Sequence, residues 1–413
     1  MTTADERTTT DYDHHSVDYA ENSRAINAEL RAKCPVAHTS AHGGFWVVSR
    51  YDDVIAVAKN DETFASGYTV DGVTPLGVVI PSSPVPMFPI EMDPPDYLPY
   101  RKLLNPLFSP AVSKSWEPRI AKWVDTCLDQ VIEKGSFDIV GDLANPVPSL
   151  FTCEFLGLPI EDWKLFGDVQ HEIIYTPPEE QGPVIERYMQ VVGRVYETIV
   201  ARRNNPIDDV ISKLVTAEID GEPITDEMVI SIVNLIMAGG FDTTTAVTAN
   251  SLIYLADHPE ARQHLIDNPD AIPTACEEFL RWFTPQQGLA RTVTKPVTVG
   301  DVELEPGERV LISWASANQD DAAFDRPDEV ILDRFPNRHT TFGMGIHRCI
   351  GSHIARNELY TMVRRVLERM PDYRVDHTNA QRYPTIGVIN GWINVPATFT
   401  PGERLGSASL PGA

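Results

Sequence analysis

The sequence predicts a mainly α-helical protein with small β-sheets, an α+β class in which strands are few. Long stretches carry apolar residues at three- and four-residue steps, and only short runs are rich in β-branched and aromatic residues. No Gly/Ser-rich linker, low-complexity tract or internal repeat divides the 413 residues. We therefore expect one domain over 26–413, preceded by a polar, acidic and flexible segment over 1–25.

Composition excludes several kinds of partner. The chain has 34 Lys and Arg against 59 Asp and Glu, a net charge of −25, which disfavours binding to nucleic acid and to anionic membranes. Its five cysteines are odd in number and widely spaced, as in a reduced protein rather than a disulfide scaffold. Residues 1–25 show neither a signal peptide nor an 18-residue apolar run. We expect a soluble, cytoplasmic protein without a membrane anchor.

The pattern of secondary structure follows from periodicity and from turn residues. Helices are predicted over 98–108, 110–133, 184–203, 225–257, 271–283 and 350–370. Short strands are predicted at Phe45–Val48 and across Val302–Ile312, the latter interrupted by a turn at 305–308. Seven prolines between Thr74 and Pro95 exclude regular structure there. The resulting loop over 74–92 is either a lid over a binding site or a plain surface excursion.

The predicted helix over 225–257 has an unusual middle. Thr225 is a good N-cap, and a helix of this length spans about 50 Å at 1.5 Å per residue. Its centre reads Ala238-Gly239-Gly240-Phe241-Asp242-Thr243-Thr244-Thr245. Each glycine costs about 1 kcal/mol relative to alanine, and a carboxylate is costly in a buried helix. This pattern predicts a local opening with a function; a close helix crossing that needs small residues is the alternative.

A single cysteine lies among glycines near the C-terminus. Residues 342–351 read Phe-Gly-Met-Gly-Ile-His-Arg-Cys-Ile-Gly, directly before the helix predicted over 350–370. A cysteine at a helix N-terminus favours the thiolate, and the glycines allow a large partner to approach the backbone. A core cysteine, or a nucleophile with a base elsewhere in the chain, stays possible. A zinc site is poorly supported, because Cys349 has no second cysteine or histidine pair at ligand spacing. One thiolate suits a metal whose other positions are filled by a macrocycle.

The same ten residues, F-G-x-G-x-H-x-C-x-G, resemble the haem-ligating signature of the cytochrome P450 family. The resemblance implies the fold of that family, with haem b between a long central helix and a cysteine-bearing loop and helix. It also implies that Cys349 is the axial ligand of the iron and that Phe342, Gly343 and Gly351 adjoin the cofactor.

Further implied roles concern protons and the support of the cysteine loop. The segment from Ala238 to Thr243 resembles the oxygen-activating motif A-G-x-x-[DE]-T of the family, which implies that Asp242 and Thr243 deliver protons during oxygen activation. The spacing of Glu278, Arg281 and Arg334 resembles the Glu-x-x-Arg plus Arg triad, whose role is structural. Taken alone, the spacing of Glu278 and Arg281 is usually that of a solvated pair on a helix surface.

Family resemblance also assigns residues to cofactor and substrate. The haem propionates are expected to contact Arg101, Arg291, His347 and Tyr97, the last at a position where many members have histidine. A phenol donates a hydrogen bond there but supplies no charge. The residues expected to face the substrate are Ala238, Thr243, Phe88, Leu289, Val388 and Ile389. Most of these are apolar, which predicts a small hydrophobic substrate.

The segments 274–281 and 339–343 resemble the bacterial branch that contains camphor and other monoterpenoid hydroxylases. The implied reaction inserts one oxygen atom of O2 into a C–H bond of a terpenoid-like molecule. No segment resembles a flavin or nicotinamide domain, so electrons from NAD(P)H are expected through a separate ferredoxin and ferredoxin reductase. Arg101, Lys102, Arg348 and Arg356 are candidates for a basic docking patch. A peroxide-driven peroxygenase and a haem-binding sensor or carrier are the alternative functions.

Overall fold

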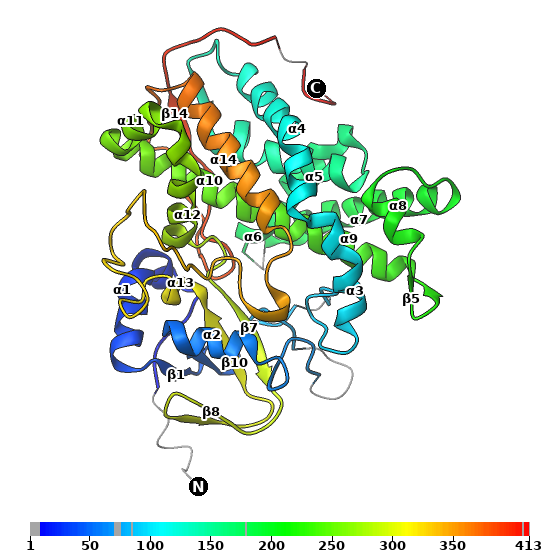
Figure 1. Ribbon diagram of the computed structural model, residues 1–413, viewed down its shortest axis with the longest axis vertical. Coiled ribbons are helices and arrows are strands. Elements are labelled where there is room, and N and C mark those ends of the chain that lie inside the picture. The colour runs from blue at the N-terminus through cyan, green and yellow to red at the C-terminus, as the bar shows by residue number, and fades with distance from the viewer. Residues whose placement is uncertain (1–8, 70–75, 84–85, 178–179, 407–408, 413) are drawn as a thin grey trace. The chain divides into compact units, whose positions relative to one another are not determined.

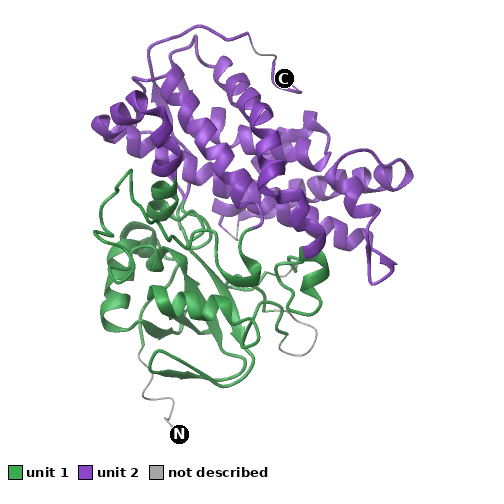
Figure 2. Ribbon diagram, in the orientation of Figure 1, with its two compact units in different colours: residues 1–101, 277–349, 384–390 green, residues 102–276, 350–383, 391–413 purple. Residues whose placement is uncertain are grey.

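The computed structural model describes residues 9–69, 76–83, 86–177, 180–406 and 409–412 (Figure 1). Two compact units are formed, each from several segments of the chain (Figure 2). Unit 1 comprises residues 1–101, 277–349 and 384–390, and unit 2 comprises 102–276, 350–383 and 391–413. Residues 74, 75, 84 and 85 of the predicted proline-rich loop lie outside the described residues. A single haem-binding domain over 26–413 stays a prediction.

A mixed five-stranded sheet forms the centre of unit 1 (Figure 1). Its order is β1 (Val36–Thr39), β2 (Phe45–Val48), β10 (Arg309–Ser313), β7 (Gly288–Val293) and β3 (Phe64–Ala65). Only the β2–β10 pair is parallel. Successive side chains of β2 enter different apolar clusters, Trp46 and Val48 one and Phe45 and Val47 the other. Both faces of this strand are therefore buried.

Each of these clusters is completed by a helix. The helix α2 (Tyr51–Lys59) adds Val54, Val57 and Ala58 to the cluster of Trp46, and α1 (Val17–Lys33) adds Tyr19, Ala20 and Leu30 to that of Phe45. Unit 1 also holds the hairpin β8–β9 (Val297–Val299, Val302–Leu304), α13 (Trp314–Ala317) and short 3-10 turns at Ala41–Gly43 and Gly345–His347. The predicted strands at 45–48 and 302–312 are confirmed.

The prediction of a flexible N-terminus as far as residue 25 is wrong for its last part. Residues 17–25 belong to α1, which Ser16 caps by accepting a hydrogen bond from the Tyr19 N–H. Tyr12 and Tyr19 are buried in the cluster of Phe45. The helix was not predicted because only a few of its residues face the core, so the sequence shows little apolar periodicity there.

Unit 2 is mostly helical (Figure 1). Its helices are α4 (Pro110–Asp129), α5 (Pro146–Leu156), α6 (Trp163–Tyr175), α7 (Gly182–Asn204), α8 (Val210–Val215), α9 (Asp226–Gly240), α10 (Asp242–Asp257), α11 (Pro259–Asp267) and α14 (Ser352–Arg369). Its small sheets are β4 (Ser136–Asp138) with β14 (Pro396–Thr398) and β11 (Arg374–Val375), β12 (Gln381–Arg382) with β13 (Trp392–Asn394), and β5 (Glu218–Ile219) with β6 (Glu222–Pro223). The helices α3 (Tyr97–Leu104) and α12 (Ile272–Phe283) run from one unit into the other.

The predicted helix over 225–257 is present but is divided at Phe241 into α9 and α10. Phe241 has φ −76° and ψ −70°, away from the ψ near −42° of a regular α-helix. Thr225 caps its start by accepting from the Met228 N–H, as its sequence predicts. By length and composition the stretch Asp226–Asp257 could cross a membrane, but buried core helices pass the same test and 44% of its most apolar window is buried.

Candidate active site

The cysteine loop of unit 1 is closed by backbone hydrogen bonds. The Cys349 N–H donates to the Phe342 carbonyl at 2.7 Å, and the Gly343 N–H donates to the Thr340 carbonyl at 2.7 Å. Gly345 has φ +73°, and a side chain there would overlap the Ala58 carbonyl oxygen. Cys349 is exposed at the end of this loop. The loop thus presents one thiol on a backbone that only glycine can follow at position 345.

The helix after the cysteine starts later than predicted. Gly351 is the N-cap of α14, and Ser352 is its first residue, whereas the sequence indicated a start at Ile350. Cys349 therefore precedes the helix by two more residues than expected. The helix dipole acts mainly within the first turn, so its effect on a thiolate at this distance is weaker than the sequence suggested.

Asn318 connects the cysteine loop to the rest of unit 1, a role that sequence reasoning missed. Its amide nitrogen donates to the hydroxyls of Thr284 at 2.8 Å and Thr341 at 2.9 Å. Its amide oxygen accepts from the Thr340 N–H at 2.6 Å. Asn318 is fully buried, so these bonds fix the loop where it leaves Thr340. Nothing in the sequence near Asn318 indicates partners more than twenty residues away.

The three residues of the predicted structural triad are brought together in the core of unit 1. Glu278 and Arg281 are 0% exposed and form a two-bonded ion pair at 2.7 and 2.8 Å. Arg334 donates from Nε to both Glu278 oxygens, at 2.9 and 3.0 Å. The remaining donors of the two arginines reach backbone carbonyls, among them Asn318 and Glu329. The alternative of a solvated surface pair is therefore wrong.

Two further polar side chains of unit 1, Arg291 and His347, are buried with few partners among the described residues. Arg291 is 4% exposed, yet its guanidinium makes one hydrogen bond, to its neighbour Ala290, and no ion pair with a described carboxylate. Burial lowers its pKa to about 10. Both ring nitrogens of His347 are buried without a partner in the part of the chain that the structure describes. Burial, with the charges of Arg291 and Arg101, lowers the pKa of His347 to about 3.

These side chains match the needs of haem, whose two propionates are anions. Buried cations and orphaned donors are costly, and carboxylates beside Arg291 and His347 would relieve both. Arg101 donates to the Arg348 carbonyl at 2.8 Å and so connects α3 to the cysteine loop. Tyr97 donates to the Ile346 carbonyl at 3.0 Å and packs against the His347 ring. Its hydroxyl thus supports the loop, and the expected propionate contact of Tyr97 stays a prediction.

In unit 2, the break between α9 and α10 places a hydroxyl beside a carbonyl. Thr243 Oγ1 donates to the Gly239 carbonyl at 2.8 Å. A side chain added at Gly239 would meet nothing within 4 Å, so this part of the helix is open. Ala238 and Gly239 are exposed, although their neighbour Met237 is buried. The predicted opening is therefore present, with Thr243 at its edge.

Asp242 lies next to Thr243 but points into the core of unit 2, where it is 2% exposed. Its carboxylate accepts from the Tyr383 hydroxyl at 2.8 and 2.9 Å and from Nδ1 of His171 at 2.7 Å. His171 comes from α6, and its Nε2 faces the Ile393 carbonyl at 3.4 Å. Sequence reasoning missed His171 and Tyr383, because they are 71 and 141 residues from Asp242.

Both nitrogens of the His171 ring therefore face acceptors, which favours the doubly protonated ring. Burial alone would lower the pKa of His171, but the hydrogen bond and charge of Asp242 raise it above its ordinary value. Because the folded-state pKa is the higher one, this pair stabilises the protein fully below the unfolded pKa of ~6.5. The stabilisation is lost as the pH rises through the folded-state pKa.

We expect His171→Gln to destabilise the holoprotein most at pH 6 and progressively less toward pH 9. Thermal unfolding of both proteins across this range measures the difference. His377→Gln is the matched control, since His377 pairs with Asp257 at 2.7 Å on the exposed surface and should contribute little at any pH. A destabilisation by His171→Gln that grows with pH would contradict the ionised pair.

The residues expected to face substrate divide between the units. Unit 2 carries Ala238 and Thr243, and unit 1 carries Phe88, Leu289, Val388 and Ile389. Ile389 forms an isolated bridge with Gln286, which brings the 388–389 segment close to the start of β7 and Leu289. Phe88, Leu289 and Val388 are half-buried, whereas Ile389 is buried. Their contact with substrate stays a prediction.

Comparison with known proteins bears directly on this arrangement. The cytochrome P450 family model matches residues 180–382. A steroid C26-monooxygenase of Mycobacterium tuberculosis is 32% identical over 394 residues, 94% of this chain and 96% of that protein. The structure of Mycobacterium marinum cytochrome P450 CYP268A2 in complex with pseudoionone has a TM-score of 0.87 at 28% identity, covering 96% of this chain and 100% of that one. CYP109E1 from Bacillus megaterium, in complex with testosterone, gives 0.82 at 28% identity, covering 93% and 100%.

The chain belongs to the cytochrome P450 family. It is an oxidoreductase that incorporates oxygen from O2, and its cofactor is haem b. The predicted fold class and family resemblance are thereby confirmed. The finer resemblance to camphor and monoterpenoid hydroxylases stays a prediction.

Proposed function

We propose that this protein inserts one oxygen atom of O2 into a C–H bond of a small hydrophobic molecule, in the cytoplasm, with electrons from NAD(P)H delivered by a ferredoxin and its reductase. The observation that carries the proposal is that, at one helix break, the Thr243 hydroxyl lies at the open side and its sequence neighbour Asp242 places a carboxylate in the core. In a protein that only binds haem, a buried carboxylate next to an accessible hydroxyl would have no chemical role.

Cys349 is proposed to hold the iron, and Arg291, His347 and Arg101 the propionates. When bound, haem b supplies the binding and cleavage of dioxygen, which the thiolate ligand favours. Burial of Arg291 strengthens its interaction with a carboxylate, because the local dielectric is low. Phe342 and Gly343 form the start of the loop, and an added Cβ at Gly343 would meet only Trp314, at 3.8 Å. That leaves room for a flat cofactor beside the loop backbone.

Thr243 is proposed to position a proton. Its hydroxyl proton is held by the Gly239 carbonyl, so the oxygen lone pairs can accept a hydrogen bond from water. Asp242 is proposed to relay protons to this water, because an ionised carboxylate paired with His171 can take up a proton and pass it on. Tyr383 and His171 both donate to Asp242 and hold its carboxylate in one orientation. These two are positioning residues, because they act through Asp242.

We expect Thr243→Ala to uncouple NAD(P)H consumption from product formation. Without the hydroxyl, the water that delivers the proton is no longer held in place, so NAD(P)H and O2 are still consumed while hydrogen peroxide replaces product. General acid catalysis of this kind typically contributes 10²–10⁴-fold, and we expect product formed per NAD(P)H to fall by at least ~10-fold. Thr243→Ser, which keeps the hydroxyl, should restore most of the coupling. Unchanged coupling in Thr243→Ala would remove this role.

A terpenoid-like or steroid-like substrate is proposed. The expected contact residues Ala238, Phe88, Leu289, Val388 and Ile389 are apolar, which suits a ligand with few hydrogen-bonding groups. The names of the relatives support this class: one is a steroid C26-monooxygenase, and the two solved structures hold pseudoionone and testosterone. A screen of terpenoids, steroids, fatty acids and aromatic acids for a shift of the haem spectrum would identify the class.

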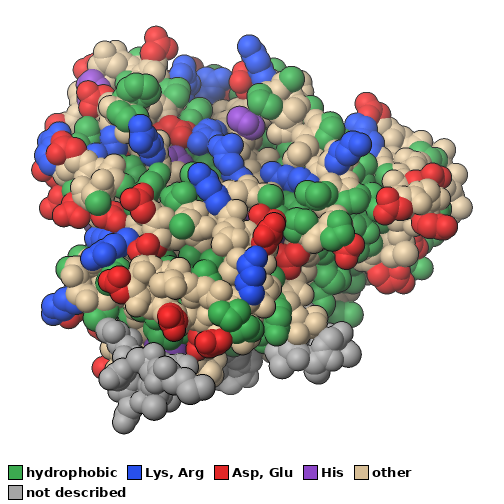
Figure 3. Space-filling model, turned by 60° about the horizontal axis from the view of Figure 1, so that its bottom comes forward, with side chains coloured by type: hydrophobic (Ala, Val, Ile, Leu, Met, Phe, Trp, Pro, Cys, Tyr) green, Lys and Arg blue, Asp and Glu red, His purple; other side chains and the backbone are tan. Residues whose placement is uncertain are grey.

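The electron donor is proposed to be acidic. Arg348 is exposed beside Cys349 on the loop, and Arg101 bonds to its carbonyl. Lysine and arginine side chains are interspersed with acidic ones on the face drawn in Figure 3, although the whole chain carries a charge of −25. The basic charge of Arg348 and Arg101 would steer an acidic carrier toward the protein.

Reconstitution tests the proposed function directly. The purified holoprotein, supplied with NAD(P)H, O2, a ferredoxin and its reductase, should form an oxygenated product from a substrate that shifts its spectrum. Product formed only with added hydrogen peroxide would favour a peroxygenase instead. Haem binding without turnover in either assay would favour a sensor or carrier.

A further inference from the structure

Three histidines and an aspartate gather in unit 1 between the segment before α1 and the turn that joins β1 to β2. Asp13, His14 and His15 precede the N-cap of α1, and His42 lies in the short turn at Ala41–Gly43. One potential ligand atom each of Asp13, His14 and His42 lies within 4.8 Å of the other two. His42 has φ 50°, a left-handed conformation that is uncommon outside glycine.

The hydrogen bonds of His14 and His15 fix their protonation. Nε2 of His14 and Nε2 of His15 both lie against the Ile80 carbonyl oxygen, at 2.9 and 2.8 Å. A carbonyl oxygen only accepts, so both Nε2 atoms carry a proton. Burial lowers the pKa of His14 to about 3, so this ring is neutral near pH 7 and its Nδ1 has a free lone pair.

That lone pair has no partner within the described residues, although His14 is 3% exposed. A buried acceptor without a donor is uncommon, and it marks a place where a further group would be stabilising. An Nε2–H bond to a backbone carbonyl with Nδ1 free is also the arrangement of a metal-binding histidine, whose second nitrogen is fixed by an outer partner.

Asp13 and His42 provide the other two potential metal ligands. Asp13 Oδ1 accepts from His42 Nε2 at 2.8 Å, close to the separation of two ligands on one small cation. Desolvation would raise the pKa of Asp13, but hydrogen bonds from His42 and the His15 N–H lower it overall, so the carboxylate is ionised near pH 7. A cation between Asp13 and His42 would displace one proton, from His42 Nε2.

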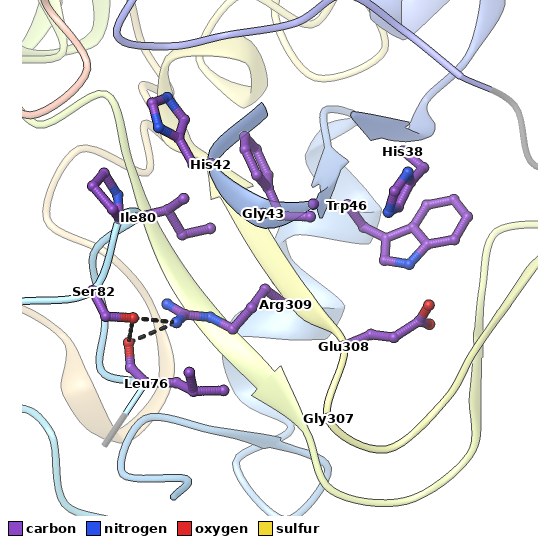
Figure 4. Close-up of a pocket in the computed structure, with 13 residues that line it drawn as sticks. His38, His42, Gly43, Trp46, Leu76, Ile80, Ser82, Gly307, Glu308 and Arg309 are labelled. Atoms are coloured by element: carbon purple, nitrogen blue, oxygen red, sulfur yellow. Dashed lines mark hydrogen bonds between the residues drawn. The ribbon is translucent and has the colours of Figure 1, made fainter. Parts of the chain in front are cut away.

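The cluster adjoins a pocket of about 550 Å³. His42 and Ile80 line this pocket, and Arg309 lies farther along its wall, where it donates to Leu76 and Ser82 (Figure 4). Because His42 is exposed and lines this pocket, a cation held by the cluster would keep an open position for water.

We propose that Asp13, His14 and His42 form a binding site for one divalent transition-metal ion. Two imidazole nitrogens and one carboxylate oxygen suit Zn²⁺, which takes three protein ligands and a water in open sites. Binding connects the segment before α1 to the β1–β2 turn and satisfies the orphaned His14 nitrogen. The site is independent of the haem ligand Cys349, which is not among its residues.

Equilibrium dialysis of the haem-loaded protein against ZnCl2, followed by metal analysis, tests the site. One tightly bound zinc per chain is expected, and His42→Ala should weaken its affinity by about 100-fold. Asp13→Asn should act in the same direction. His42 and Asp13 are used because His14→Ala removes a buried side chain. In the wild type only, zinc should also slow the hydrogen exchange of residues 9–16.

His377→Ala is the matched control. His377 and Asp257 form an exposed pair at a similar separation, 2.7 Å against 2.8 Å for His42 and Asp13. In the described chain, however, no third potential metal ligand is grouped with them. This variant should bind zinc as the wild type does. Equal zinc binding by His42→Ala and the wild type, loss of the tight zinc in His377→Ala, or no tight zinc in the wild type would each overturn the site.

Discussion

Glu278→Ala should yield little or no haem-loaded protein. The change removes the carboxylate that lies between Arg281 and Arg334 and leaves both guanidinium groups buried without an anion. Breaking a buried pair in this way costs about 3–5 kcal/mol, a large part of the stability of a typical domain. The segment 325–337 is attached to the triad through the Ile331 N–H, which donates to Glu278, and through the Asp325 carbonyl, which accepts from Arg334. Loss of the triad should therefore also loosen the chain that leads to the cysteine loop. Haem content per chain and thermal unfolding measure the effect.

Glu329→Ala is the control in the same segment. The Glu329 side chain pairs with Arg326 at the same three-residue spacing, but both side chains are more than half exposed. Exposed pairs of this kind contribute 0–1 kcal/mol, so haem content should stay at the wild-type level. Normal haem content in Glu278→Ala would show that the triad does not support the cofactor site.

Cys349→Ala should abolish oxygenation while leaving the fold largely intact. The side chain is exposed at the end of its loop, so its removal creates no large cavity. Changes to outer partners of a metal ligand already cost 10–100-fold, and the loss of the ligand itself should lower product formation by more than ~100-fold. Far-UV circular dichroism and product formation with the reconstituted electron carriers measure the two effects separately.

Cys34→Ala is its matched control, because Cys34 is the other cysteine that is not buried. Its replacement should leave both haem binding and turnover unchanged. If Cys349→Ala retained wild-type turnover, the thiol would not be the ligand and another side chain would have to hold the iron.

Local sequence signals predicted much of the fold and part of the site. The long amphipathic stretches became α4, α7, α12 and α14 with shifts of a few residues at their ends. The glycine-rich centre of the long helix predicted a local opening, and the helix is divided there, because two adjacent glycines and a β-branched run weaken it at that point. Such features can be predicted because they depend only on residues that are neighbours in the sequence.

What the sequence did not reveal are partners that are far apart along the chain. Asp242 is a candidate from the sequence, but its partners His171 and Tyr383 lie in distant segments and carry no motif. Asn318 was missed for the same reason. The helix α5 was missed because almost all of its residues are buried, which removes the alternation of apolar and polar faces. In each case the information lies in tertiary packing.

The spectrum of the reduced haem protein with carbon monoxide tests the central claim, that the Cys349 thiolate ligates haem iron, most directly. The protein should be expressed with ample haem precursor, purified, reduced and exposed to carbon monoxide. We predict a coloured protein whose carbonyl complex absorbs as cysteinate-ligated haem does. A colourless protein, or a carbonyl complex that absorbs like a histidine-ligated globin, would contradict it.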